Sequence, residues 1–132
     1  MCENDKTIVS KTFHKSERLC SKKLIKELFD RGSSFFLYPI KVFYLPSPQG
    51  SSNQVIFSVP KRNIKKAVDR NKIKRRLKES YRSNKMLLID TNDEPKFYLI
   101  AFIYLGKQIL PYKEIDDKLK SSLWRLQKVK KY

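Results

Sequence analysis

Basic side chains gather in one stretch of the sequence, residues 61–85. This segment holds 12 lysines or arginines and two acids, Asp69 and Glu79, so its net charge is +10. The whole chain of 132 residues carries +17, so less than a fifth of the residues supplies more than half of the net charge. Positive charge at this density suits a polyanion, and we expect the partner to be a nucleic acid.

The same stretch has the apolar period of an amphipathic helix. Ile73, Leu77 and Tyr81 recur every four residues and form one stripe. We therefore expect a helix over residues 67–84 that docks by this stripe and leaves a basic face exposed. At about 100° per residue, the polar side chains on the neighbouring face are Asn71, Lys74, Arg75, Lys78 and Arg82.

The charges on this face are not arranged for the stability of the helix. Three like-charged pairs at i, i+4 spacing cost about 1 kcal/mol together, at roughly 0.2–0.5 kcal/mol each. They are Arg70/Lys74, Lys74/Lys78 and Lys78/Arg82, whereas Arg75/Glu79 is an opposite-charge pair at that spacing. Bound phosphates would turn the repulsion into attraction and release counterions. A solvated basic face is the simpler interpretation of an average charged helix, but the single sign of charge favours nucleic acid.

The composition limits the class of protein. The chain is long enough for one domain with a core, and 40% of its residues are apolar. We expect a mobile arm over residues 1–17 and a single domain over 18–132. The sequence has neither a membrane-length apolar run nor the apolar core of a signal peptide, so we expect no membrane partner and a cytoplasmic location. Cys2 and Cys20 have no ligand-spaced partners and are expected to be reduced thiols.

Patterns that carry catalysis or bind metal are scarce. His14 is the only histidine, which argues against a Ser-His-Asp triad and against a histidine-centred metal site. The sequence has no phosphate-cradling glycine loop and no nucleophile motif. The acids Asp90, Asp93 and Glu94 are a possible Mg²⁺ site, but a solvated turn is favoured because no second cluster supports them. We expect a binding protein with no catalytic and no metal-binding residues of its own.

The other elements predict a layered α/β fold with the order α-β-β-β-α-β-α. Ser21 and Gly32 are expected to cap a first helix over residues 21–31. The nine apolar residues 97–105 predict a central strand covered on both faces. Shorter strands are expected over residues 35–37, 40–45 and 55–59, and a closing helix over 112–130, with Trp124 packing at the edge of its apolar stripe.

The strand over residues 40–45 is apolar on both faces. Ile40, Val42 and Tyr44 point one way, and Lys41, Phe43 and Leu45 point the other. Such a strand is either sandwiched between layers or leaves one face for a ligand. Burial of Phe43 is the favoured interpretation from the pattern alone.

The basic helix and the strand before it also match a known motif. Residues 57–61 are FSVPK and residues 67–75 are AVDRNKIKR, which resembles the SVxKK…AVxRNxxKRxxRE signature, the RNR motif, of the bacterial ribonuclease P protein component. The matching residues are Ser58, Val59, Lys61, Ala67, Val68, Arg70, Asn71, Lys74, Arg75 and Glu79. Arg18, Leu19, Ile25, Phe29 and Gly32 are similar to the opening of that family, and residues 112–119 to its closing helix.

The resemblance implies a fold and an activity. The fold is a two-layer α/β sandwich with a four-stranded sheet, similar to a domain of a small-subunit ribosomal protein. Its strand–helix–strand unit crosses over left-handed, against the usual preference. In the family the protein joins a catalytic RNA, and that RNA with its Mg²⁺ ions removes the 5′ leader of precursor tRNA. The protein alone is therefore not expected to be catalytic.

The resemblance also assigns two sets of site residues. Contacts to the RNA subunit are expected from Lys61, Arg62, Lys66, Arg70, Asn71, Lys74, Arg75, Lys78 and Arg82. The cleft for the single-stranded leader is expected to be lined by Ile25, Phe29, Phe43 and Ser58. Lys78 stands where the family usually has arginine, and Ile25 where an aromatic residue is common. Core packing of Phe29 is an equally favoured alternative.

Two other functions fit the basic helix. A structural RNA binder, such as a ribosomal protein or an RNA chaperone, would share the helix but would not distinguish precursor from mature tRNA. A duplex-DNA binder would place the helix in the major groove. Base-reading side chains here lie within a dense field of phosphate-binding charge, so no DNA partner is expected.

Overall fold

The computed structural model describes residues 18–19, 21–46, 53–85 and 97–130. Within them the predicted order of helices and strands is confirmed. The elements are α1 (Lys22–Arg31), β1 (Ser33–Leu37), β2 (Ile40–Pro46), β3 (Gln54–Ser58), α2 (Ala67–Asn84), β4 (Tyr98–Tyr104) and α3 (Tyr112–Lys130). The predicted arm over residues 1–17 and the acids Asp90, Asp93 and Glu94 lie outside the described residues.

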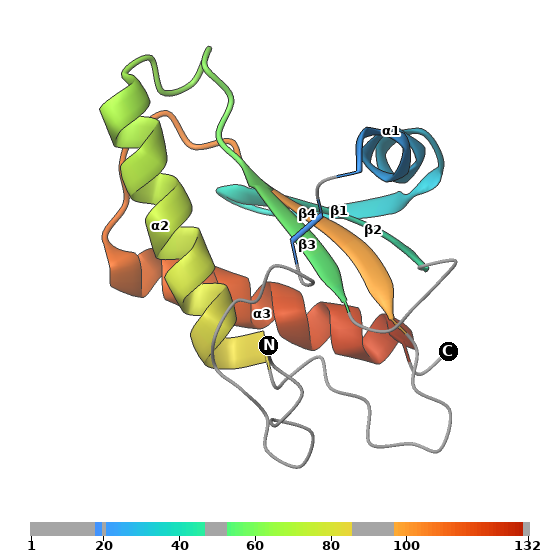
Figure 1. The fold of residues 1–132 in the computed structure, drawn as a ribbon. Coiled ribbons are helices and arrows are strands. Elements are labelled where there is room, and N and C mark those ends of the chain that lie inside the picture. The colour runs from blue at the N-terminus through green and yellow to red at the C-terminus, as the bar shows by residue number, and fades with distance from the viewer. Residues whose placement is uncertain (1–17, 20, 47–52, 86–96, 131–132) are drawn as a thin grey trace, which may run out of the picture.

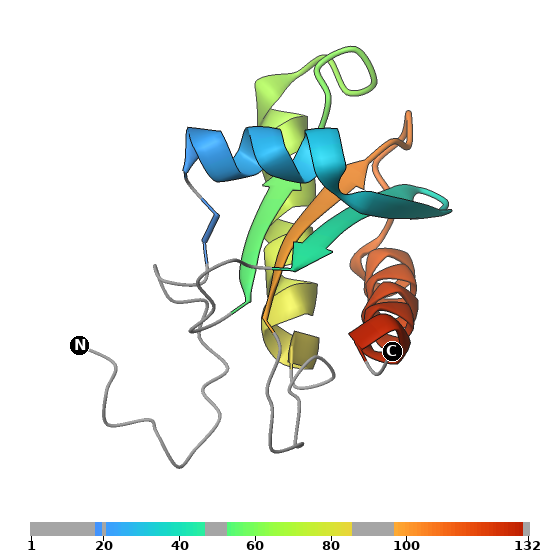
Figure 2. The ribbon, with the colours of Figure 1, turned by 90° about the vertical axis from the view of Figure 1, so that its right-hand side faces the viewer.

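The four strands form one mixed sheet in the order β1-β2-β4-β3. β2 pairs antiparallel with β1 and with β4, whereas β3 and β4 are parallel and are joined through α2. In Figure 2 both parallel strands point upward with β4 to the right of β3, and α2 lies behind them. The β3–α2–β4 crossover is therefore left-handed, as the family resemblance implies and against the usual preference.

The helices are divided between the two faces of the sheet (Figure 1). α2 and α3 cover one face and enclose the larger core, while α1 lies across the other face over a smaller core. The central strand β4 supplies both cores, because Ile100 and Phe102 point toward α2 and α3 while Leu99 and Ala101 point toward α1. This position explains why the strand is apolar at every residue.

Local signals set the ends of α1. The Ser21 Oγ accepts a hydrogen bond from the Leu24 N–H at 3.3 Å, and the Gly32 N–H donates to the Leu28 carbonyl at 2.8 Å. A Cβ at Gly32 would collide with that same carbonyl oxygen and lie 2.9 Å from the Tyr44 carbonyl oxygen. Glycine is therefore required by the close approach of α1 to the neighbouring strand.

α2 docks by the predicted stripe. Ile73 and Leu77 are completely buried and Tyr81 is 2% exposed. The Tyr81 ring meets the Phe57 ring edge-on at 6.0 Å, and Phe57 stacks on Phe102 at 5.6 Å. Rings at these separations add roughly 0.5–1.5 kcal/mol per pair beyond their burial.

Trp124 on α3 does not pack as predicted. Its side chain is 53% exposed, whereas Leu123 beside it is completely buried. Successive helical residues are about 100° apart, and that rotation takes Trp124 from the core stripe onto the solvent side.

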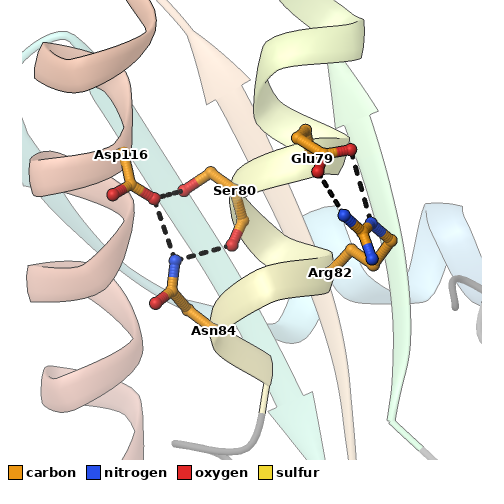
Figure 3. Close-up of polar contacts among 5 residues, drawn as sticks. All are labelled: Glu79, Ser80, Arg82, Asn84 and Asp116. Carbon is orange, nitrogen blue, oxygen red and sulfur yellow. Dashed lines mark hydrogen bonds and ion pairs between the residues drawn. The ribbon is translucent and has the colours of Figure 1, made fainter. Parts of the chain in front are cut away.

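A polar seam fastens α2 to α3 (Figure 3). The buried Ser80 hydroxyl donates to Asp116 Oδ1 at 2.6 Å, and Asn84 Nδ2 donates to the same oxygen at 2.9 Å. Asn84 Nδ2 also donates to the Ser80 carbonyl at 2.8 Å, and Lys120 Nζ lies 3.2 Å from Asp116 Oδ2. Burial raises the pKa of Asp116, but these bonds from Ser80, Lys120 and Asn84 outweigh it and leave that pKa below its ordinary value.

Replacing Asp116 tests this seam. Asp116→Ala should lower the free energy of unfolding at neutral pH by about 1–3 kcal/mol, because the buried Ser80 hydroxyl loses its acceptor. A carboxyl whose pKa is lowered by folding stabilises the protein above its unfolded pKa, and this contribution is lost as the pH falls through the folded pKa. The deficit of the variant, measured by urea denaturation, should therefore shrink on acidification below about pH 4. Asp117→Ala, at the next and exposed position, should stay within about 0.5 kcal/mol of wild type. Equal stabilities of the two variants at neutral pH would show that the hydrogen bonds of Asp116 do not stabilise the contact between α2 and α3.

Candidate nucleic-acid interface

The exposed face of α2 carries the predicted basic residues. Because Ile73, Leu77 and Tyr81 face the sheet, the opposite side of the helix is turned to solvent. Asn71, Arg75 and Lys78 are exposed on it, and Lys74 and Arg82 are half-buried at its margins. The structure therefore brings these five side chains onto one continuous face.

The segment before α2 extends this face. Lys61, Arg62 and Lys66 are all exposed, while Ile64 is buried and anchors the segment to the core. Lys66 is the N-cap of α2, and its side chain makes no capping hydrogen bond. The first turn of a helix concentrates unpaired N–H groups and positive potential, so this end of α2 also suits an anion.

Arg70 has a structural contact that the sequence did not indicate. Its Nη1 donates to the Ile64 carbonyl at 2.9 Å and to the Lys65 carbonyl at 2.7 Å. The guanidinium thus holds the segment before α2 against the first turns of the helix. Both bonds come from one nitrogen, and the group carries further N–H donors that can reach a phosphate.

Arg82 forms an ion pair with Glu79. Its Nε lies 3.3 Å from Glu79 Oε1, and its Nη2 pairs with Glu79 Oε2 (Figure 3). The hydrogen bond from Arg82 lowers the pKa of Glu79 below its ordinary value, and the pKa of Arg82 is raised in turn. Glu79 therefore neutralises Arg82 rather than Arg75, which leaves the charge of Arg75 available in the middle of the face.

Two open hollows flank α2 and contain basic residues that the sequence analysis did not single out. One of about 370 Å³ is lined by Lys72, Arg75, Arg76, Glu79 and Tyr112. In it Arg76 Nη1 donates to the Leu110 carbonyl and fastens the start of α3 to α2. The other, of about 410 Å³, is lined by Asn63, Ile64, Lys65, Lys66, Asp69, Lys107, Gln108 and Ile109. The sequence could have indicated Lys107 as a member of this hollow. Lys107 follows β4, and the segments that follow two parallel neighbouring strands meet at one edge of the sheet.

The predicted leader residues lie on the face of the sheet that α1 covers. The Phe29 ring on α1 meets the Phe43 ring on β2 edge-on at 4.8 Å, and Ile25 packs into the same smaller core. Phe29 is 39% exposed and Phe43 is half-buried. Phe29 therefore packs against Phe43 while part of its surface stays exposed, so core packing and a contact with the leader are compatible.

Ser58 lies in a separate row of the same sheet face. The strand register places Ser58, Ile103, Lys41 and Phe36 side by side across the four strands. None of these four side chains is fully buried, so the row extends beyond the part of the sheet that α1 covers. Within this row, Lys41 Nζ lies 5.2 Å from the centre of the Phe43 ring, so the row brings a cation to the aromatic pair.

The described residues offer no group of three or more His, Cys, Asp or Glu side chains placed to hold a metal ion. None of the helices in the described part of the chain is long and apolar enough to span a membrane.

An exposed cationic helix on a mixed α/β sheet, with aromatic rings on the far face, defines a small RNA-binding protein. The chain matches the Ribonuclease P family model over residues 13–127. It is 35% identical over 118 residues to the ribonuclease P protein component of Porphyromonas gingivalis, a match that covers 85% of this chain and 84% of that protein.

Solved structures share the fold. The ribonuclease P protein of Thermotoga maritima superposes with a TM-score of 0.68 at 24% identity, covering 83% of this chain and 96% of that one. That of Staphylococcus aureus gives 0.68 at 20% identity, covering 86% and 97%. The chain belongs to the ribonuclease P protein family. It is thus a protein subunit of an endoribonuclease that matures the 5′ end of tRNA, and it associates with the ribonuclease P RNA.

The contact of Arg70 with the segment before α2 leads to a stability prediction. Arg70→Ala should lower the free energy of unfolding by about 1–2 kcal/mol, because the Ile64 and Lys65 carbonyls lose a charged donor. It should also speed hydrogen exchange at the Asn63 and Ile64 amides, which donate to the Pro60 carbonyl within that segment.

Arg75→Ala is the matched control, because it removes the same charge from an exposed position five residues further along α2. Its unfolding free energy should stay within about 0.5 kcal/mol of wild type. If exchange in the segment before α2 is equally fast in both variants, Arg70 does not hold that segment.

Proposed function

We propose that the protein uses two surfaces in ribonuclease P, one for the RNA subunit and one for the 5′ leader of precursor tRNA. The observation that carries the proposal is their separation. The cationic face of α2 is turned to solvent, and the Phe29–Phe43 pair lies on the sheet face opposite to the one that α2 covers. One protein can thereby hold a folded RNA and a single strand at the same time.

The surface for the RNA subunit is the face of α2 together with the segment before it. Asn71, Lys74, Arg75 and Lys78 form its centre, where the side chains have charge or hydrogen-bonding groups to offer a phosphate. Lys61, Arg62 and Lys66 extend it toward the helix N-terminus. Arg70 and Arg82 stand at its margin, because part of each guanidinium is used by protein acceptors.

The surface for the leader uses aromatic faces and a cation. Unpaired bases stack on aromatic side chains, and each stack contributes roughly 1–3 kcal/mol without a requirement for sequence. Phe29 and Phe43 provide the rings, and Ile25 forms the adjoining wall. Lys41, beside the Phe43 ring, provides the cation for the phosphates of the leader. The Ser58 hydroxyl lies in the neighbouring row as a polar contact.

The chemistry belongs to the RNA subunit in this proposal. Mg²⁺ held mainly by that RNA would supply the activated water for phosphodiester hydrolysis. The protein contributes cations that reduce the repulsion between two RNAs, and it adds affinity for the leader. Its place of action would be the cytoplasm, where precursor tRNA is made and processed.

Reconstitution tests the proposal. Adding the protein to a bacterial ribonuclease P RNA should raise cleavage of precursor tRNA at low Mg²⁺ concentration. At one fixed salt concentration the complex should also bind precursor tRNA more tightly than mature tRNA, and both more tightly than duplex DNA. Equal affinity for precursor and mature tRNA would instead support a structural RNA binder.

Replacing the aromatic pair isolates the leader surface. Phe29→Leu combined with Phe43→Leu keeps an apolar core but removes the ring faces. The affinity of the reconstituted enzyme for precursor tRNA should fall about 5-fold or more, while that for mature tRNA stays unchanged. Trp124→Leu on α3 removes another exposed ring and should change neither. A loss that is equal for both tRNAs would show that the rings matter only for folding.

A further inference from the structure

The hairpin between β1 and β2 exposes a pair of aromatic rings that the two proposed surfaces do not use. Phe36 is 50% exposed and Tyr38 is 61% exposed. Their ring centroids are 6.1 Å apart in an edge-on arrangement with an interplanar angle of 86°. Exposed rings cost solvation free energy, and two of them together at the tip of a hairpin indicate a binding surface.

The strand register places Phe36 on the same face as the proposed leader surface. Phe36 pairs with Lys41 and Ser34 pairs with Phe43, so the side chain of Phe36 points to the α1 side of the sheet. The opposite orientation is taken by Phe35, which lies under the Arg125 guanidinium of α3 at 4.7 Å. Phe36 and Phe43 are diagonal neighbours, with Cα atoms roughly 7–8 Å apart by strand geometry.

Lys41 connects the two aromatic groups. It pairs directly with Phe36 across the strands, and its Nζ lies 5.2 Å from the centre of the Phe43 ring. A backbone phosphate beside Lys41 would therefore have one ring on each side on which a base can stack. Alternating rings and cations are the arrangement by which proteins hold single strands without sequence preference.

We propose that Phe36 and Tyr38 form a second stacking site, which extends the leader track to the β1 edge of the sheet. This inference rests on the leader surface proposed above. β1 is the strand farthest from β3, against which α2 packs. With the catalytic RNA on α2, the β1 edge takes the leader nucleotides that are farthest from the cleavage site. The occupant is thus an unpaired nucleobase of the leader.

Precursor tRNAs with leaders of graded length test the second site. In the enzyme reconstituted with a bacterial ribonuclease P RNA, wild-type affinity should rise with leader length until the leader covers both aromatic groups. Phe36→Leu should remove the last part of that rise, weakening long-leader substrates about 5-fold. Short-leader substrates and mature tRNA should bind as they do to wild type. Phe36→Tyr keeps a ring face and should restore the dependence, and Trp124→Leu should leave it unchanged.

Each of the following outcomes would contradict the proposal of a second stacking site. If Phe36→Leu and wild type show the same dependence on leader length while both still prefer precursor over mature tRNA, the second site is wrong and the proposed function stands. If wild type shows no preference for any leader, both fail. If Phe36→Leu changes only the sedimentation behaviour of the free protein, the rings are a contact between copies of this chain. Because Phe36 is half exposed, the variants are expected to fold, and circular dichroism checks this.

Discussion

The burial of one stripe of α2 is the interaction on which the rest of the structure depends. Ile73, Leu77 and Tyr81 are removed from water against β3 and β4, and full burial of such side chains contributes roughly 1.5–3 kcal/mol each. That gain exceeds the roughly 1 kcal/mol by which like charges along the helix repel one another. The helix can therefore present a cationic face that would be a poor arrangement for an isolated helix.

The sheet determines where the proposed leader surface would lie. With α2 and α3 over one face, side chains alternate along each strand between the larger core and the side that carries α1. α1 covers the middle of that side, and its Phe29 reaches Phe43 there. The row through Lys41 is only partly covered, because Ser58, Ile103 and Lys41 are half-buried and Phe36 is exposed.

Periodicity and capping residues predicted the elements closely, because they depend on neighbours within a few positions. The bounds of α2 and α3 and the caps of α1 follow from such local signals. Partners that come from distant backbone could not be predicted in the same way. Arg76 uses the carbonyl of Leu110, and no spacing rule anticipates that bond.

The exposure of Trp124 and the ring pair of Phe36 and Tyr38 likewise depend on tertiary placement. The left-handed crossover was available only through the family resemblance, because general topology rules favour the other hand. The residues proposed for RNA and leader contacts come from the same resemblance and remain predictions. Their arrangement on two faces, and the use of Arg70 and Arg82 by protein acceptors, required the structure.

The salt dependence of binding to the ribonuclease P RNA tests the central claim, that the docked helix exists to present its charges to that RNA. Arg75→Ala with Lys78→Ala removes two exposed charges from α2, and Lys118→Ala with Lys128→Ala removes two from α3. The α2 pair should make the plot of log K against log salt shallower by about 1.5, whereas the α3 pair should leave its slope close to that of wild type. An unchanged slope for the α2 pair, or an equal change for both pairs, would contradict the account.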